Sequence, residues 1–287
     1  MTVRANVPFE EYVAQTGLNI SRLKHLRQSP AHYRHRLQDP PDSDTLRSGR
    51  VVHTAVLEPD KFESRYAVWE ARKADGTMAA RYGKPWDQFV AEATGDKREV
   101  ITLDQHRHAM AIRKAVRGDR CALDYIDGGQ AEVVLDWRMH GRQCKGRVDM
   151  IALQVRDDPP TIVGLKTTVD ARPFLFGAHA ARLGYHLQWA WYFDGFKALT
   201  GEIPLMVEIV VEKTPPHAVA VYRITNDIIE QGREEYMQLL DLLAECEVND
   251  RWPGPTFGMV HDLTFPSWAL NRGGASDDIV DLELEAA

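Results

Sequence analysis

Two charged residues in strand-like segments near the middle of the chain have the chemistry for phosphodiester hydrolysis. Asp149 lies in KGRVDMIAL, and Lys166 follows 17 residues later in TIVGLKTT. A short loop between adjacent strands would bring the carboxylate and the ammonium together. The carboxylate can hold a hard cation such as Mg²⁺, which polarises phosphate and activates water, while the lysine orients that water or balances developing charge. The same two residues also fit a plain cross-strand ion pair.

A helical segment further along the chain adds an amide and a phenol. Gln188 and Tyr192 are four residues apart in YHLQWAWYFDG, with Tyr185 on the same side, so they share one face of the expected helix. Both groups can hydrogen-bond phosphate oxygens, although a core helix would show the same alignment. His53 lies between apolar residues in GRVVHTAVL, which fits either a core position or a metal ligand.

The hydrophobic pattern predicts helices on both sides of a strand-rich centre. Helices are expected over 19–41 with a break at Pro30, over 46–59, within 81–95, and over 103–118, 174–201 and 225–247. Strands are expected over 131–139, 142–155, 160–168, 205–213 and 218–224. This order predicts an α/β fold, with a central mixed sheet, a crossover helix and flanking helices.

The acidic net charge of the chain does not by itself exclude nucleic-acid binding. The formal net charge is −7, yet residues 21–50 carry seven Lys and Arg against three Asp, so a local basic groove for nucleic acid remains compatible with the sequence. No apolar run approaches the ~20 residues that span a bilayer, so we expect no membrane association. The three cysteines are far apart in the sequence, which indicates a reducing cytoplasm.

Taken together, six segments resemble the RecE-type exonucleases (exodeoxyribonuclease VIII-like), a phage and prophage branch of the PD-(D/E)xK nuclease superfamily. In order they are SRLKHLRQSPAHYRHRLQDPP, LRSGRVVHTAVLEPDKFESRYAV, CKGRVDMIAL, LKTTVDARPFLFGAHAARLGYHLQWAWYFDG, VVEKTPPHAVAVYRI and RWPG with FPSWAL. The resemblance extends over nearly the whole chain. It implies one exonuclease-like domain over 1–272, followed by an acidic tail over 273–287.

The resemblance implies a restriction-endonuclease-like core and a 5′→3′ exonuclease that acts on double-stranded DNA ends with Mg²⁺ or Mn²⁺. Such an enzyme leaves 3′ single-stranded tails for recombination, with a single-strand annealing protein as a partner. It also implies a homo-oligomeric ring through which DNA threads, inside the cytoplasm of a bacterial host. An acidic exterior around a basic channel would reconcile the net charge with DNA binding.

Roles for individual residues also follow from the resemblance. His53, Asp149 and the Leu165 backbone carbonyl correspond to metal ligands, and Lys166 to the motif lysine. Gln188 and Tyr192 correspond to a pair that contacts the DNA backbone. The remaining candidates are Lys145 and Arg147, which flank Asp149 and could meet phosphate, and Glu132, a weaker candidate at the edge of the site.

One motif position departs from the family pattern. The second acidic residue belongs two positions before the lysine, where this chain has Gly164. Asp157, Asp158 and Asp170 are near in sequence, but none clearly replaces it. We therefore keep three interpretations: an engineered or acquired inactivating change, a catalytically deficient DNA-end-binding relative, or a carboxylate from elsewhere, such as Glu132. A scaffold that keeps only the fold is a further alternative. If the carboxylate is simply missing, Gly164→Asp should raise nuclease activity.

Overall fold

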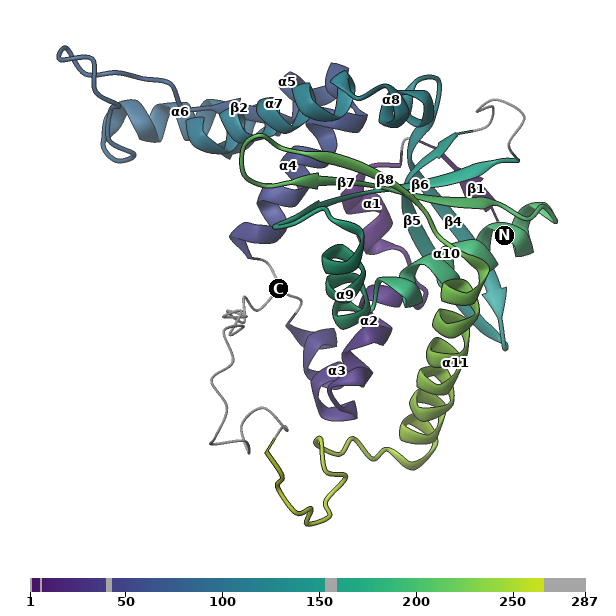
Figure 1. The fold of residues 1–287 in the computed structure, drawn as a ribbon. Helices are drawn as coiled ribbons and strands as arrows, with labels where there is room; N and C mark the ends of the chain where they lie inside the picture. The colour runs from purple at the N-terminus through teal and green to yellow at the C-terminus, as the bar shows by residue number, and fades with distance from the viewer. Residues whose placement is uncertain (1, 6, 40–42, 153–158, 266–287) are drawn as a thin grey trace, which may run out of the picture.

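The computed structural model describes residues 2–5, 7–39, 43–152 and 159–265, and a six-stranded mixed sheet forms their centre (Figure 1). The strand order is β1-β4-β5-β6-β7-β8. Only β6 and β7 run parallel within this sheet. The strands are β1 (Thr2–Arg4), β4 (Gln130–Met139), β5 (Arg142–Ala152), β6 (Thr161–Thr168), β7 (Leu205–Glu212) and β8 (Val219–Arg223).

Helices cover both faces of the sheet and create two buried cores. On one face lie α4 (Asp44–Leu57), α7 (Leu103–Gly118) and α8 (Arg120–Ile126), which contact β5, β7 and β8. On the other face α10 (Tyr185–Thr200) contacts β4 and β5, and it packs on α11 (Asn226–Asn249) and α2 (Ile20–Leu23). Figure 1 shows the two layers on opposite sides of the strands. These layers confirm the predicted α/β fold with a central mixed sheet.

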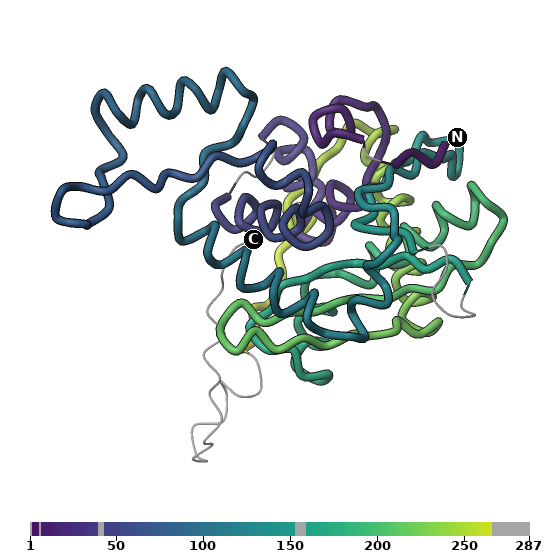
Figure 2. The backbone as a smooth tube through the Cα atoms, turned by 90° about the horizontal axis from the view of Figure 1, so that it is seen from above, coloured from purple at the N-terminus to yellow at the C-terminus, as the bar shows by residue number. Residues whose placement is uncertain are grey.

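Shorter elements complete the described residues. They are α1 (Phe9–Ala14), η1 (Lys24–Arg27), α3 (Pro30–Gln38), η2 (Pro59–Lys61), α5 (Phe62–Arg65), α6 (Lys84–Gly95), α9 (Pro173–Leu183) and the parallel pair β2 (Tyr66–Val68) and β3 (Glu99–Ile101). The segment around α6 projects from one side of the body in both views (Figures 1 and 2).

Local signals fix several helix ends. Thr102 and Gln105 form a reciprocal capping box at the start of α7, and the Ser29 hydroxyl accepts a hydrogen bond from the His32 N–H at the start of α3. Pro30 is the first residue of α3. At this position the missing N–H removes no hydrogen bond of the helix. The expected helix over 174–201 is wrong in one respect: Gly184, with φ of +66°, separates α9 from α10.

The connection between the parallel strands β6 and β7 passes through α9 and α10, as a parallel pair requires. This crossover lays α10 over the sheet face that carries the side chains of Lys166 and Glu208. Among the described residues, none of the helices is long and apolar enough to cross a membrane. The acidic tail over 273–287, Asp157 and Asp158 fall outside the described residues.

Candidate active site

The strands β5 and β6 separate at Asp149. Their pairing ends at Met150 opposite Val163, so Asp149 and Gly164 are the next two residues beyond the paired region. The Asp149 carboxylate lies in this fork and accepts a hydrogen bond of 2.9 Å from the Leu165 backbone N–H. The fork therefore directs one carboxylate between the strands, where the sequence analysis expected a metal ligand.

The neighbouring strand β4 is distorted at the same level. Glu132 has φ of +55°, a conformation that L-residues seldom adopt, and neither it nor the opposite Asp149 joins the strand pairing. Ala131 packs with the core beneath α7, whereas Val133 packs with the core beneath α10. Residues two apart on a regular strand point to the same face of the sheet. The distortion at Glu132 therefore places the side chains before and after it on opposite faces.

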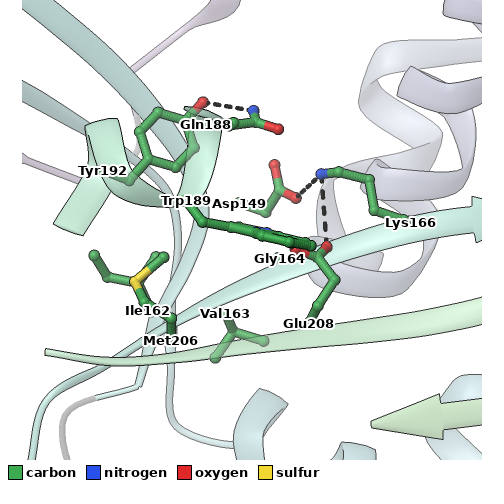
Figure 3. Close-up of a pocket in the computed structure, with 10 residues that line it drawn as sticks. All are labelled: Asp149, Ile162, Val163, Gly164, Lys166, Gln188, Trp189, Tyr192, Met206 and Glu208. Atoms are coloured by element: carbon green, nitrogen blue, oxygen red, sulfur yellow. Dashed lines mark hydrogen bonds and ion pairs between the residues drawn. The ribbon is translucent and has the colours of Figure 1, made fainter. Parts of the chain in front are cut away.

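Lys166 lies between two carboxylates from different strands. Its Nζ is 3.6 Å from Asp149 Oδ2 and 3.6 Å from Glu208 Oε1, so these two oxygens lie within twice that distance of each other (Figure 3). The predicted proximity of Asp149 and Lys166 is confirmed. Glu208, on β7, was missed by the sequence analysis.

Glu208 had a sequence signal that could have revealed it. It is the only charged residue within the apolar run LMVEIVV of β7, and an ionised group in a buried strand requires a partner. Glu208 is 1% exposed. Its Oε2 accepts a hydrogen bond of 2.5 Å from the Trp189 indole N–H. Within the described part of the chain, its buried Oε1 has no hydrogen-bond partner and forms an ion pair with Lys166.

Burial and charge act in opposition on the protonation of these groups. Burial alone would raise the pKa of Asp149, but His53, Lys166 and the Leu165 amide outweigh it and lower that pKa. Burial raises the pKa of Glu208 despite the opposing charge of Lys166. Burial works against the ammonium of Lys166, yet Glu208 and Asp149 hold its pKa above the ordinary value. The side chain of Lys166 is therefore protonated and positively charged at neutral pH.

His53 reaches the same carboxylate from the opposite helical layer. It lies on α4, and its Nδ1 is 3.6 Å from Asp149 Oδ1. Burial lowers the pKa of His53 more than Asp149 raises it, which favours the neutral imidazole that binds metals. His53, Asp149 and Lys166, which are far apart in the sequence, thus meet at the fork.

The helix α10 closes the other side of a small pocket. Gln188 Nε2 donates a hydrogen bond of 2.9 Å to the Tyr192 hydroxyl, and both residues line the pocket with Lys166 and Asp149 (Figure 3). The predicted shared face of Gln188 and Tyr192 is therefore correct. The pocket leaves about 10 Å³ open to a water molecule, which is room for about one.

The lining of this pocket does not include the candidates His53, Leu165, Lys145, Arg147 and Glu132. Lys145 is 1% exposed, and its Nζ donates to the backbone carbonyls of Tyr12 at 2.8 Å and Gln15 at 2.7 Å. This corrects the expectation that Lys145 meets phosphate, because its ammonium is buried beneath α1. Arg147 Nε lies 3.0 Å from Glu132 Oε2. Glu132 is engaged with that guanidinium and does not line the pocket beside Gly164.

The donor atoms at the fork fit a hard divalent cation. The described residues contain no ready-made group of three or more His, Cys, Asp and Glu side chains arranged for a metal. Lys166 lies between the two carboxylates, however, and a buried oxygen of Glu208 lacks a hydrogen bond. Carboxylate and carbonyl oxygens are the ligands that Mg²⁺ and Mn²⁺ prefer.

Comparisons with known proteins identify a family and a related fold. The family described as "PDDEXK-like domain of unknown function (DUF3799)" matches residues 19–257. No curated protein is similar enough in sequence to count as a match. Among solved structures, a "Putative exonuclease" from Eubacterium rectale covers 93% of this chain and 99% of its own, with 14% identity and a TM-score of 0.61.

A second solved structure, of the protein SSO0001, also has 14% identity and covers 80% of this chain and 81% of its own. Its TM-score of 0.29 is too low to carry an argument. The similarity to the Eubacterium rectale protein shows a common fold.

Proposed function

This chain belongs to the family of the PDDEXK-like domain of unknown function, and from that membership and the geometry of the fork we propose that it is a divalent-metal-dependent nuclease acting on DNA. The observation that carries the proposal is the meeting of Asp149, His53 and Lys166 at the end of the β5–β6 pairing. A plain cross-strand ion pair would need neither the histidine nor the interrupted pairing.

In this proposal Asp149, His53 and the Leu165 carbonyl would hold the cation. When bound, the ion would supply Lewis-acid activation of the phosphate and of the attacking water. The protonated Lys166 orients that water or balances the charge that develops on the phosphoryl oxygens. The Tyr192 hydroxyl and the Gln188 amide, already joined by a hydrogen bond, line the pocket and offer donors to the DNA backbone.

For the substrate we propose double-stranded DNA ends, degraded 5′→3′ by a homo-oligomeric ring that hands its product to a single-strand annealing protein. Support comes from the sequence resemblance to RecE-type exonucleases and from the fold shared with the Eubacterium rectale protein described as a "Putative exonuclease". Linear duplexes labelled at either the 5′ or the 3′ end distinguish the polarity, and closed circular DNA tests the need for an end. Analytical ultracentrifugation measures the assembly.

The nuclease proposal is tested with Lys166→Met and Asp149→Asn on linear duplex DNA in Mg²⁺, Mn²⁺ or chelator. Wild-type protein should cleave only with metal, and both variants should lose at least about 100-fold in rate, the usual contribution of a charge-stabilising group. Lys197→Met is the matched control, because Lys197 is an exposed lysine of α10 outside the pocket.

Equal cleavage by wild type and Lys166→Met would contradict the proposal. A wild-type protein that binds duplex ends but never cleaves them would support the non-catalytic end-binding alternative that Gly164 raised.

A further inference from the structure

Gly164 faces Glu208 across the parallel β6–β7 pair, in direct register. A Cβ atom built on Gly164 would lie 2.5 Å from Glu208 Oε2 and 2.7 Å from Cδ, and nearer still to Oε1. Real Cβ atoms essentially never approach other atoms so closely. The carboxylate of Glu208 therefore fills the space into which a side chain at position 164 would project (Figure 3).

We propose that Glu208 supplies the second metal-binding carboxylate of this site, entering from β7 into the space that an acidic residue at position 164 would occupy. This inference rests on the proposed metal-dependent function. It adds a residue from a strand outside the usual motif, and it changes the meaning of Gly164. The glycine is required by Glu208, and its presence does not mark a lost ligand.

The contacts of Glu208 support this role. One oxygen, Oε2, is fixed by the Trp189 indole, which orients the carboxylate. The other, Oε1, points to Lys166 but has no hydrogen bond, although it is buried. The Lys166 ammonium, 3.6 Å away, makes no hydrogen bond to this buried oxygen, and a cation beside Asp149 would satisfy it.

A structural role for Glu208 would make a different prediction. If Glu208 only balances the charge of Lys166 and accepts from Trp189, then a glutamine could still accept from the indole. Metal affinity would then fall by no more than the roughly 10- to 100-fold that an outer-shell partner contributes. If Glu208 is a ligand, losing its charge must weaken metal binding, because the affinity of hard-cation sites depends on the number of carboxylates.

Calorimetric titration with Mn²⁺ alone, without DNA, separates the two roles. Glu208→Gln should bind Mn²⁺ more than about 100-fold more weakly than wild type, beyond the roughly 10- to 100-fold that the loss of an outer-shell partner causes. Glu212→Gln is the matched control, because Glu212 lies on the same strand and accepts a hydrogen bond from the Ala171 N–H that glutamine can keep. A loss of Mn²⁺ affinity smaller than about 100-fold in Glu208→Gln would overturn the inference.

A positional exchange provides the second test. Gly164→Asp with Glu208→Gly moves the carboxylate from β7 to β6, and it should recover part of the Mn²⁺ affinity lost in the Glu208→Gly single variant. Gly164→Asp alone should be destabilised without gaining affinity, because the new side chain has no space. A Gly164→Asp variant as stable as wild type, with tighter Mn²⁺ binding, would show that position 164 is an empty ligand position.

The outcomes for the proposed function and for this inference are distinguishable. If Asp149→Asn abolishes cleavage and Mn²⁺ binding while Glu208→Gln affects neither, the nuclease proposal stands and the inference falls. If wild type binds Mn²⁺ through Asp149 and Glu208 but cleaves no DNA, the inference stands and the nuclease proposal falls. A wild-type protein that binds no Mn²⁺ contradicts both.

Discussion

Gly164 and Glu208 lie opposite each other on β6 and β7, and the space between them holds only one side chain. The size of the side chain that position 164 can accept therefore depends on which residue occupies position 208. The expectation that Gly164→Asp would simply restore a missing carboxylate overlooked this neighbour. A glycine inside a strand often marks such a close approach, and Gly164 fits that pattern.

Gly164→Ala should lower the free energy of unfolding by about 1–3 kcal/mol, as over-packing of a buried site usually does. The Glu208 carboxylate cannot move away freely, because Trp189 and Lys166 hold it. Denaturant unfolding measures the change. Gly49→Ala, in open space on α4, is the control and should gain up to about 1 kcal/mol.

The double variant Gly164→Ala with Glu208→Gly should show a smaller loss than the two single variants together, since the alanine then has room. Strict additivity would mean that the two residues do not compete for space.

Glu132 gives the protein a pH dependence that can be isolated. Burial, opposed by Arg147, raises the pKa of Glu132 from its ordinary value to about 7. Between the unfolded value and about 7, the folded protein keeps a proton that the unfolded chain has released, so the free energy of unfolding falls as pH rises through this window.

Glu132→Gln should remove this decline and reduce the loss of stability between about pH 5 and about pH 8 by about 1–3 kcal/mol. Urea unfolding at the two pH values measures it. Glu202→Gln is the control, because it eliminates a carboxylate that is exposed on the surface. A wild-type and a Glu132→Gln protein with the same pH slope would contradict this assignment.

How much the sequence predicts about single residues depends on strand register. The meeting of Asp149 with Lys166 follows from two adjacent strands joined by a short loop, and the shared face of Gln188 and Tyr192 follows from helical spacing. Glu208 stands out in β7 as a lone charge among apolar residues. That it lies beside position 164 depends on the β6–β7 register, which is set by the long crossover through α9 and α10.

At the scale of elements, α10 carries the pocket residues and is positioned by α11. Gly232 of α11 lies against the His186 carbonyl: a Cβ there would be 2.5 Å from the carbonyl carbon, closer still to its oxygen, and 3.0 Å from Ala190 Cβ. The two helices therefore approach closely only because residue 232 has no side chain.

Gly232→Ala should force α10 and α11 apart and lower the free energy of unfolding by about 1–3 kcal/mol, although alanine is the better helix former. Because Gln188, Trp189 and Tyr192 move with α10, Mn²⁺ affinity should fall as well. Thermal unfolding and calorimetry measure the two effects. Gly177→Ala, in open space on α9, is the control and should be neutral or stabilising. Equal effects of both substitutions would contradict close helix packing at Gly232.

Elements with strong local signals match the sequence prediction best. The helix over 103–118 has the predicted bounds because a capping box starts it. The division at Gly184 was missed, although a glycine in the left-handed conformation is a common helix end. The three-residue strands β1, β2 and β3 were also missed, since such short strands exist only through partners distant in the sequence.

At the scale of the whole molecule, the net charge is acidic, so binding of the proposed DNA substrate would depend on local basic residues such as Lys24 and Lys166. Lys24 and Lys166 both lie over the ring of Tyr185, at 5.8 and 5.5 Å from its centre. Several other basic residues of the 21–50 stretch are engaged in ion pairs, such as Arg27 with Glu235 and Arg34 with Asp250. Lys24 Nζ donates a hydrogen bond of 3.3 Å to the Leu183 carbonyl and shares the Tyr185 ring with the pocket residue Lys166, so Lys24 is the member of that stretch chosen to test a phosphate contact.

Duplex DNA binding should weaken with salt, with a slope of about −0.9 in log K against log salt for each neutralised phosphate. Lys24→Met should make the slope shallower by about one phosphate, whereas Lys197→Met should leave it unchanged. Fluorescence anisotropy between about 50 and 200 mM salt measures the slopes. A flat salt dependence of the wild type would contradict a groove that tracks phosphates.

The buried ammonium of Lys145 has a consequence for where this folding unit begins. The family similarity starts at residue 19, yet Lys145 holds the backbone of residues 12–15, and β1 pairs with β4 along the outer side of the sheet. Trimming the protein to the family boundary would remove the three carbonyls that bind the ammonium and uncover the edge of β4 at residues 134–136. Exposed strand edges of this kind promote aggregation. A chain that starts at residue 19 should therefore accumulate in the insoluble fraction, and recovery of a soluble, monodisperse protein would show that the first residues are dispensable.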